Sequence, residues 1–396
     1  MSNQIEYCDI VIIGGSIAGN YLSYLLFDSK LKIVVIEEHK EIGSPLQCAG
    51  IISKKLKDLI YLPEDIVLNR VKVAKIISPS GKVLKLSGNE EPYVIDRIGL
   101  DKLFYEKIKD FNDIKYYLGE KFISFEYINK KHQDYLIIQT SKRKLKSKML
   151  IGCDGPLSRV AKILGVKNKI IYGTQIRIQS DFNENEALMW FDPRWKELFG
   201  WIVPEGNKIY RIGLASATNL SKNFKIFLKK LNVNYNKRIN QQGGIIPYGT
   251  MKKSSFNNII LLGDSAGQVK ATTGGGIIML LIASKYAARC IKLCFKHNNF
   301  SKRFIRKHYE KLCLAAIGKQ LKIHYILRRL FETFTNKDFE TLFRIIKQSN
   351  IEEMISLYGD MDFPRELIFK LLKNRIAIWF IIKFLMKHPL AIFKML

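Results

Sequence analysis

The sequence predicts an α/β protein in which a Rossmann-like dinucleotide-binding domain carries an inserted antiparallel β-sheet substrate domain and is followed by a C-terminal helical region. Three observations lead to this prediction. An apolar strand pattern over 8–13 runs directly into a glycine-rich turn and an apolar helix pattern. A second strand-rich block covers 170–214. From Gly276 onward the chain is nearly all helix pattern.

The glycine-rich turn over residues 14–19, GGSIAG, has the order of a phosphate grip. Gly14 permits a tight turn after the strand, and Gly19 lets the following helix pack close to that strand. Backbone N–H groups at the helix start then face a pyrophosphate. Ser16 stands where the usual GxGxxG pattern has its middle glycine. The alternative interpretation is an ordinary turn between a strand and a helix.

A second strand pattern, residues 31–36, ends at Glu37, eighteen residues after Gly19. The separation expected for the acid that binds the ribose hydroxyls of an adenine dinucleotide is about 20 residues. A carboxylate at this position accepts hydrogen bonds from those hydroxyls and repels a 2′-phosphate. Glu37 therefore supports the dinucleotide interpretation, although a solvated strand end is the alternative.

Two later apolar strands also end in glycine and an acid. One runs over 149–153 into Asp154 and Gly155, and the other runs over 259–262 into Gly263 and Asp264. Gly274, Gly275 and Gly276 follow and open a long helix pattern at Ile277. Either element alone is more typical of an ordinary turn. Three such strand ends together are what a cofactor spanning several strands requires.

On these motifs the sequence resembles the flavoprotein monooxygenase-like superfamily and, within it, the geranylgeranyl reductase family. The resemblance implies FAD as cofactor, with Glu37 near its ribose, Asp154 supporting FAD and the pyridine nucleotide, and Asp264 near the pyrophosphate and ribityl chain. Arg97 is similar to a family arginine near the phosphates, although pairing with Asp96 or Asp101 is its alternative role. The FAD-binding residues expected from the motifs and the resemblance are Gly14, Gly15, Ser16, Ala18, Gly19, Glu37, Cys48, Ala49, Arg97, Asp154, Gly155, Asp264, Gly274, Gly275, Gly276 and Ile277.

Two further segments resemble the reductase branch. Residues 41–50 are similar to the segment in which the family places a cysteine near the active site, here Cys48. Residues 199–204, FGWIVP, resemble the family's YxWxFP motif, which lines a prenyl-chain cavity, with Phe199 in place of Tyr and Val203 in place of Phe. The resemblance therefore places Phe199, Trp201 and Pro204 in the substrate cavity, with Cys48 and Trp201 as the catalytic residues. Cys48 is either a proton donor or a wall residue that shapes the cavity.

The function implied is an FAD-dependent reductase that saturates C=C bonds of geranylgeranyl chains in archaeal-type membrane lipids or their precursors. The alternatives are an aromatic monooxygenase or halogenase of the same fold, and a non-catalytic flavin-binding protein associated with membranes. Gly243 and Gly244 follow no apolar strand and are interpreted as a loop, so no second nucleotide-binding motif is expected. Electrons are then expected from a transient donor, which is NAD(P)H, a ferredoxin or a deazaflavin.

Composition restricts the setting. The six cysteines show no metal-ligand spacing, which predicts a reducing, cytoplasmic location and no metal site. The 65 basic residues against 36 acidic ones give a net charge of +29, which indicates an anionic partner. Because no nucleic-acid-binding motif accompanies the charge, an anionic membrane surface is favoured over nucleic acid. Compositional drift toward lysine is the alternative.

The last residues, 376–396, are apolar but interrupted by charges and Pro389, so an interfacial helix is favoured over a membrane-spanning one. Its expected lysine stripe and inserting aromatic residues are Lys383, Lys387, Lys394, Trp379, Phe380 and Phe384. A helix docked on the protein's own core is the alternative. The predicted domains are an FAD-binding domain of residues 1–70, 97–168 and 255–296, a substrate domain of 71–96 and 169–254, and the C-terminal helical region 297–396.

Overall fold

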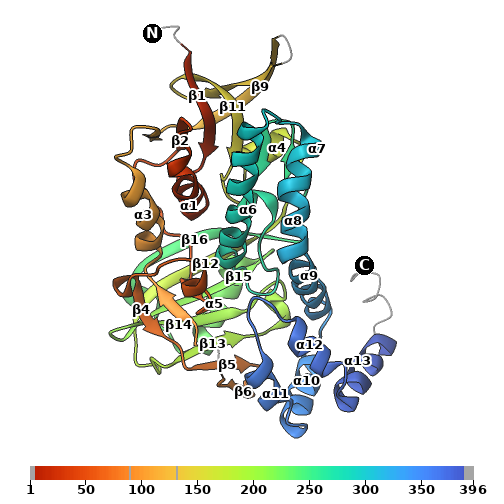
Figure 1. The fold of residues 1–396 in the computed structure, drawn as a ribbon. Coiled ribbons are helices and arrows are strands. Elements are labelled where there is room, and N and C mark those ends of the chain that lie inside the picture. Colours follow the sequence, from red (N-terminus) through yellow and green to blue (C-terminus); the bar gives the residue numbers. More distant parts are fainter. Residues whose placement is uncertain (1–4, 89–90, 131–132, 388–396) are drawn as a thin grey trace.

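A computed structural model describes residues 5–88, 91–130 and 133–387 (Figure 1). Three sheets and a set of helices make up this part of the chain. The strands are β1 (Glu6–Ile13), β2 (Ile33–Glu37), β3 (Ile51–Ile52), β4 (Val67–Arg70), β5 (Val73–Ile77), β6 (Val83–Leu86), β7 (Tyr93–Ile95), β8 (Ile114–Leu118), β9 (Phe122–Lys130), β10 (Gln133–Thr140), β11 (Lys144–Gly152), β12 (Lys169–Gln179), β13 (Glu186–Trp190), β14 (Gly200–Gly206), β15 (Ile209–Ser216), β16 (Arg238–Tyr248), β17 (Ser255–Phe256) and β18 (Ile259–Leu261). The helices are α1 (Ile17–Leu26), α2 (Leu56–Leu59), α3 (Arg97–Ile108), α4 (Arg159–Ile163), α5 (Leu220–Lys230), α6 (Ile277–Lys296), α7 (Lys302–Ile305), α8 (Lys311–Cys313), α9 (Lys319–Phe331), α10 (Asn336–Gln348), α11 (Ile351–Tyr358), α12 (Arg365–Leu371) and α13 (Arg375–Lys387).

The first sheet has the strand order β17-β18-β11-β1-β2-β8, and β10 and β9 extend it beside β11. Strands β18, β11, β1, β2 and β8 run parallel. The carboxyl ends of β1, β2, β11 and β18 therefore meet at one edge, because Ile13 pairs with Gly152 and Ile36, and Gly152 pairs with Leu261 of β18. This arrangement brings the three predicted strand ends together, as a doubly wound sheet requires.

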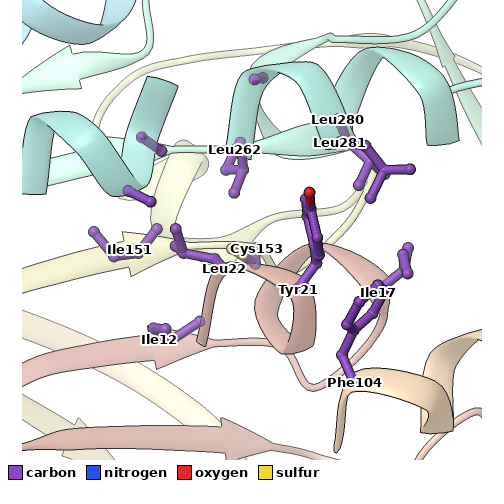
Figure 2. Close-up of a cluster of buried hydrophobic side chains, with 14 of the residues drawn as sticks. Ile12, Ile17, Tyr21, Leu22, Phe104, Ile151, Cys153, Leu262, Leu280 and Leu281 are labelled. Carbon is purple, nitrogen blue, oxygen red and sulfur yellow. The ribbon is translucent and has the colours of Figure 1, made fainter. Parts of the chain in front are cut away.

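Helices α1, α3 and α6 cover one face of the parallel sheet. Figure 2 shows the core between them, in which Ile12 and Ile151 of the sheet lie opposite Leu22 of α1 and Leu281 of α6. The four side chains are fully buried. The β-branched residues of the strands and the apolar face of α1 are what the sequence pattern required.

The second sheet has the order β16-β12-β15-β14-β13-β5-β6 and is antiparallel except for the β13–β5 pair. Its strands come from 73–86 and 169–248. The mixed α/β fold with a parallel sheet, an antiparallel sheet and C-terminal helices confirms the predicted fold class. The exact domain boundaries stay a prediction.

Gly243 and Gly244 correct one prediction. They lie within β16 and not in a loop, and Gly244 pairs with Gly173 of β12. The local sequence shows no strand pattern here. The segment is nevertheless a strand because β12 supplies its hydrogen-bond partners, and local sequence does not report such pairing.

Helices α10 to α13 gather at one end of the molecule, beside β5 and β6 (Figure 1). Helix α13 packs through Phe384, which is buried against Phe334, so the expectation that Phe384 is free to insert into a membrane is wrong. Lys387 binds Asp338 at 2.7 Å and therefore does not simply face solvent as part of a lysine stripe. The remaining stripe residue Lys394, and Pro389, lie outside the described residues. Among the helices described, none is both long and apolar enough to cross a membrane.

Candidate functional site

The turn between β1 and α1 brings the start of α1 against the end of β11. Gly14 has a φ of +105°, and a Cβ there would lie 2.4 Å from the carbonyl oxygen of Cys153, so only glycine fits. The Ser16 side chain makes no capping bond to α1. It donates instead to Asp101 at 2.9 Å and accepts from Arg97 at 3.2 Å. The first-turn N–H groups of α1 are thus left without a side-chain cap and can bind an anionic group.

Arg97 links several of the predicted residues. Its guanidinium forms an ion pair with Asp101 across one turn of α3, while Asp96 caps α3 by accepting from Ile98 N–H at 3.0 Å. Burial lowers the pKa of Arg97, but Asp101, Cys48 and Asp264 oppose this effect and the net pKa is raised. The alternative pairing with Asp101 and the position beside the start of α1 are therefore both present in the structure.

The start of α6 lies beside the start of α1. A Cβ on Gly263 would lie 3.6 Å from Cβ of Ala18 in α1 and 3.8 Å from Cβ of Leu280 in α6. Gly276 precedes α6 and provides no side-chain cap. The Asp264 carboxylate lies at this junction, where burial raises its pKa to about 6 and Arg97 partly offsets that effect. Two uncapped helix starts and a desolvated carboxylate thus converge at one place.

Glu37 and Asp154 have protein partners. Glu37 accepts from Gly15 N–H at 2.7 Å and from both His39 N–H and the His39 ring at 2.9 and 2.7 Å, so it fixes the glycine turn. Asp154 accepts from the Ser158 hydroxyl at 2.5 Å and from Val160 N–H at 3.1 Å. Glu37 thus lies beside the glycine turn, whereas both Asp154 oxygens are bonded to the start of α4.

A cavity of about 440 Å³ lies between the second sheet, the glycine loop 270–276 and the C-terminal helical region. Its lining is mostly apolar. Of the predicted site residues it includes Cys48, Ala49, Phe199, Trp201, Gly274 and Gly275. Pro204 is not part of the lining, and its carbonyl accepts from Asn69 at 3.2 Å. Cys48 and Trp201, 153 residues apart in the chain, therefore share one cavity.

Trp201 is held in the cavity wall by a residue that sequence reasoning missed. Its indole N–H donates to Gln175 Oε1 at 2.8 Å, and Gln175 Nε2 donates to the Cys48 carbonyl at 3.4 Å and to Gln242 at 3.0 Å. The ring lies over Gly213, where a Cβ would come within 2.3 Å of it. A buried glutamine inside an apolar strand was the available signal, since such a group needs a partner.

The backbone of the Cys48 segment is fixed by a buried arginine. Arg211 donates to the Ala49 carbonyl at 2.9 Å and to Glu205 at 3.1 Å, and its side chain is 4% exposed. Gly50 N–H donates to Cys48 Sγ at 3.3 Å. The thiol is therefore placed at the cavity by contacts from the second sheet.

The C-terminal region closes the cavity on the side of the glycine loop. Lys270, at the start of that loop, binds Asp362 at 2.5 Å and the Met361 carbonyl at 3.1 Å. The side chains of Lys270 and Asp362 are 5% and 0% exposed. Residues Ile355, Gly359 and Met361 line the cavity. Sequence reasoning had not connected this region with the site.

His324 and Arg328 of α9 hold the same loop from outside. His324 Nε2 lies 3.1 Å from the Asp362 carbonyl, which can only accept, so Nδ1 accepts from the Thr272 hydroxyl at 2.6 Å. Burial lowers the pKa of His324 to about 4, which keeps the ring neutral. Arg328 donates to the Ala271 carbonyl at 2.6 Å. The loop is thus tied to the C-terminal helices at three successive residues.

Known proteins resemble this chain over most of its length. No protein-family model matches it. An uncharacterized protein of Methanocaldococcus jannaschii is 28% identical, covering 94% of this chain and 96% of that protein. Digeranylgeranylglycerophospholipid reductase 1 of Methanococcoides burtonii is 26% identical, covering 87% of this chain and 89% of that protein. The resemblance to the geranylgeranyl reductase family is confirmed.

Solved structures establish the fold. A geranylgeranyl bacteriochlorophyll reductase-like protein of Thermoplasma acidophilum superposes with a TM-score of 0.79 at 21% identity, over 93% of this chain and all of that one. The p-nitrophenol 4-monooxygenase PnpA of Pseudomonas putida superposes with a TM-score of 0.65 at 11% identity, over 89% of this chain and 97% of that one. The chain therefore has the fold of FAD-dependent monooxygenases and reductases.

Proposed function

We propose that the protein is an FAD-dependent reductase that saturates C=C bonds of geranylgeranyl chains in archaeal-type membrane lipids or their precursors. The observation that carries the proposal is the apolar cavity whose wall holds Cys48 and Trp201 and which reaches the glycine loop at Gly274 and Gly275. The relatives named as digeranylgeranylglycerophospholipid reductases support the choice of substrate.

The converging helix starts fit FAD. The pyrophosphate would lie at the start of α1 with Arg97 alongside, where dipole and guanidinium both favour negative charge. Glu37 would accept from a ribose hydroxyl next to the turn it fixes. Asp264 would bind hydroxyl groups of the ribityl chain, which restore the hydrogen bonds that its desolvated carboxylate lost.

The protein's part in the reduction is to orient and shield the alkene. Bound FAD supplies the hydride chemistry. Because an isolated alkene has no carbonyl to polarise, a proton must reach the second carbon as the first receives hydride. Cys48 provides the proton from its thiol at the cavity wall. Positive charge that develops on the more substituted carbon is stabilised by the π-face of Trp201, which lines this mostly apolar cavity.

The donor of electrons is transient in this proposal, whether NAD(P)H, a reduced ferredoxin or a deazaflavin. The net charge of +29 favours encounter with an acidic ferredoxin.

The test is mass spectrometry of digeranylgeranylglycerophospholipid after anaerobic incubation in detergent with the FAD-loaded protein and dithionite. We expect the lipid to gain two daltons for each bond reduced. Cys48→Ala should slow the reaction per bound FAD, and Cys313→Ala, at a buried cysteine away from the cavity, serves as the matched control. An unchanged lipid mass with a fully reduced flavin contradicts the proposal. Oxygen consumption with a phenolic substrate would favour a monooxygenase instead.

A further inference from the structure

Helix α13 is apolar on two faces, and only one of them is packed. Ala377 and Phe384 are buried, and Phe380 packs with them against the cluster that includes Phe334 and Phe339 of the α9–α10 region. Ile376, Trp379, Ile382 and Met386 are exposed instead, with Trp379 56% and Met386 71% exposed. Spacings of three and four residues place these four on one side of the helix.

The exposed face continues onto α12 and is strongly basic. Phe369 and Leu372 are exposed next to it in the chain. Residues 365–387 contain six lysines and arginines but only one acid, Glu366. Lys383 lies over the Trp379 ring at 4.6 Å, and Arg365 lies over the Phe369 ring at 5.2 Å. We define the α12–α13 surface as two sets of residues. The exposed apolar residues are Phe369, Leu372, Ile376, Trp379, Ile382 and Met386, and the basic residues among them are Arg365, Lys370, Lys373, Arg375 and Lys383.

The α12–α13 surface adjoins the cavity. Helix α12 has the cavity on one side and the exposed surface on the other, because Leu367 lines the cavity with Met361, whereas Phe369, two residues further along, lies on the opposite side of the helix and is exposed. Figure 1 shows α11, α12 and α13 together at the end of the molecule where β5 and β6 lie. A chain that entered the cavity beside α12 would pass Met361 and Leu367 before it reached Cys48 and Trp201, which line the same cavity.

Charge complementarity identifies the occupant. Apolar side chains surrounded by lysine and arginine are typical of surfaces that insert at the level of lipid headgroups, with the cations toward anionic phosphates. Asp338 offsets the charge of Lys387, so a second copy of the chain would bring four net positive charges against four, and self-association through this face is opposed. An acidic protein would satisfy the cations but leave the apolar side chains without partners.

We propose that the α12–α13 surface docks on a bilayer with anionic headgroups, and that the substrate chain enters the cavity from it beside α12; the second half of this inference rests on the proposed function. Trp379 and Met386 insert among the lipid chains, and the lysines contact the headgroups. Each basic residue at such a surface contributes about a fivefold increase in affinity, which salt reduces.

Vesicle flotation of the FAD-loaded full chain tests the docking. We expect flotation with equal parts phosphatidylcholine and phosphatidylglycerol, weaker flotation with phosphatidylcholine alone, and partial loss at high salt. Phe369→Ser/Trp379→Ser should weaken binding at least about tenfold, because two aromatic side chains no longer insert. Ile163→Ser/Ile239→Ser removes exposed apolar side chains elsewhere and should float like the wild type. Truncation of α13 is not used, because it would expose the buried cluster around Phe384.

Brominated phosphatidylglycerol gives a second, local measurement. Of the four tryptophans, Trp195 and Trp201 are buried, and Trp190 is half-buried and packed against the core of the second sheet, away from α13. Quenching of tryptophan fluorescence by bromine in the acyl chains should therefore report Trp379, and it should disappear in Trp379→Phe, which retains binding. Flotation without this quenching, or equal flotation of the two double variants, overturns the proposal. A concentration-dependent dimer that Phe369→Ser/Trp379→Ser abolishes would also overturn it, in favour of self-association.

The outcomes separate this inference from the proposed function. If Phe369→Ser/Trp379→Ser loses reduction of lipid in vesicles but reduces the same lipid in detergent at the wild-type rate, entry from the bilayer through this surface is supported. If the wild type reduces neither substrate but still floats and is quenched, the reductase proposal fails and the docking surface stands. If vesicle activity is equal in both variants, the entry route is wrong.

Discussion

The ion pair between Lys270 and Asp362 gives the sharpest test of how the C-terminal region is attached. The two side chains are 5% and 0% exposed and meet at 2.5 Å, so Lys270→Met leaves a carboxylate buried without its cation. Removal of one partner of a buried pair costs about 3–5 kcal/mol of unfolding free energy. Asp362→Leu should cost a similar amount, because it leaves the ammonium with only the Met361 carbonyl at 3.1 Å.

The double variant Lys270→Met/Asp362→Leu should recover most of the loss, because replacement of a whole buried pair by apolar side chains is often neutral. Urea unfolding of the FAD-free protein, followed by tryptophan fluorescence, gives the free energies for a double-mutant cycle. Lys208→Met removes an exposed pair with Asp181 and should cost less than about 1 kcal/mol. If Lys270→Met costs no more than Lys208→Met, the pair does not anchor the region.

Three other substitutions follow from the site. Gly14→Val should purify without flavin, because its Cβ would lie 2.4 Å from the Cys153 carbonyl oxygen, and a yellow variant with full FAD content would contradict this assignment. In the FAD-free protein, the Asp264 pKa of about 6 lies above the unfolded value of 3.8, so the carboxyl favours folding at low pH and this contribution is lost as the pH rises from about 4 to 6. Asp264→Asn should therefore exceed the wild type in stability by up to about 3 kcal/mol at neutral pH, with the difference gone near pH 4 in a series of urea titrations, and a constant difference at all pH values would refute the argument. Gln175→Leu leaves the buried Trp201 indole N–H without an acceptor, which should lower the unfolding free energy by about 1–3 kcal/mol and raise the KM for lipid. Gln175→Glu keeps an acceptor oxygen at this position. Equal effects of the two substitutions would show that the hydrogen bond is unimportant.

The predictable part of the site is the part encoded over short distances in the chain. The turn at Gly14, the acid at Glu37 and the strand end at Asp264 each follow a strand pattern, and the parallel sheet then brings them to one edge. The function of the carboxylates was less predictable. Asp154 ends a strand in the expected way, but its oxygens bind Ser158 and Val160.

The parts that sequence reasoning missed depend on contacts between distant segments. Gly243 lies in a strand although the local sequence shows no strand pattern, because the strand is held by pairing with β12. Periodicity shows that α13 is apolar, but it does not show that Phe384 packs against Phe334 while Trp379 is exposed. Lys270 reads as one lysine among many, since its partner Asp362 follows 92 residues later.

The glycine loop over 270–276 lies between two parts of the molecule and is held by both. Lys270 binds Asp362 between α11 and α12, and Thr272 and the Ala271 carbonyl bind α9, while Gly274 and Gly275 line the cavity. A ligand in the cavity and the C-terminal region both favour the ordered state of the loop, so they act on the same equilibrium between its ordered and disordered states. By thermodynamic reciprocity, each must strengthen the other by the same factor. Changes in the C-terminal helices are therefore expected to alter ligand affinity in the cavity even where they touch no ligand, and the two regions are not free to vary independently.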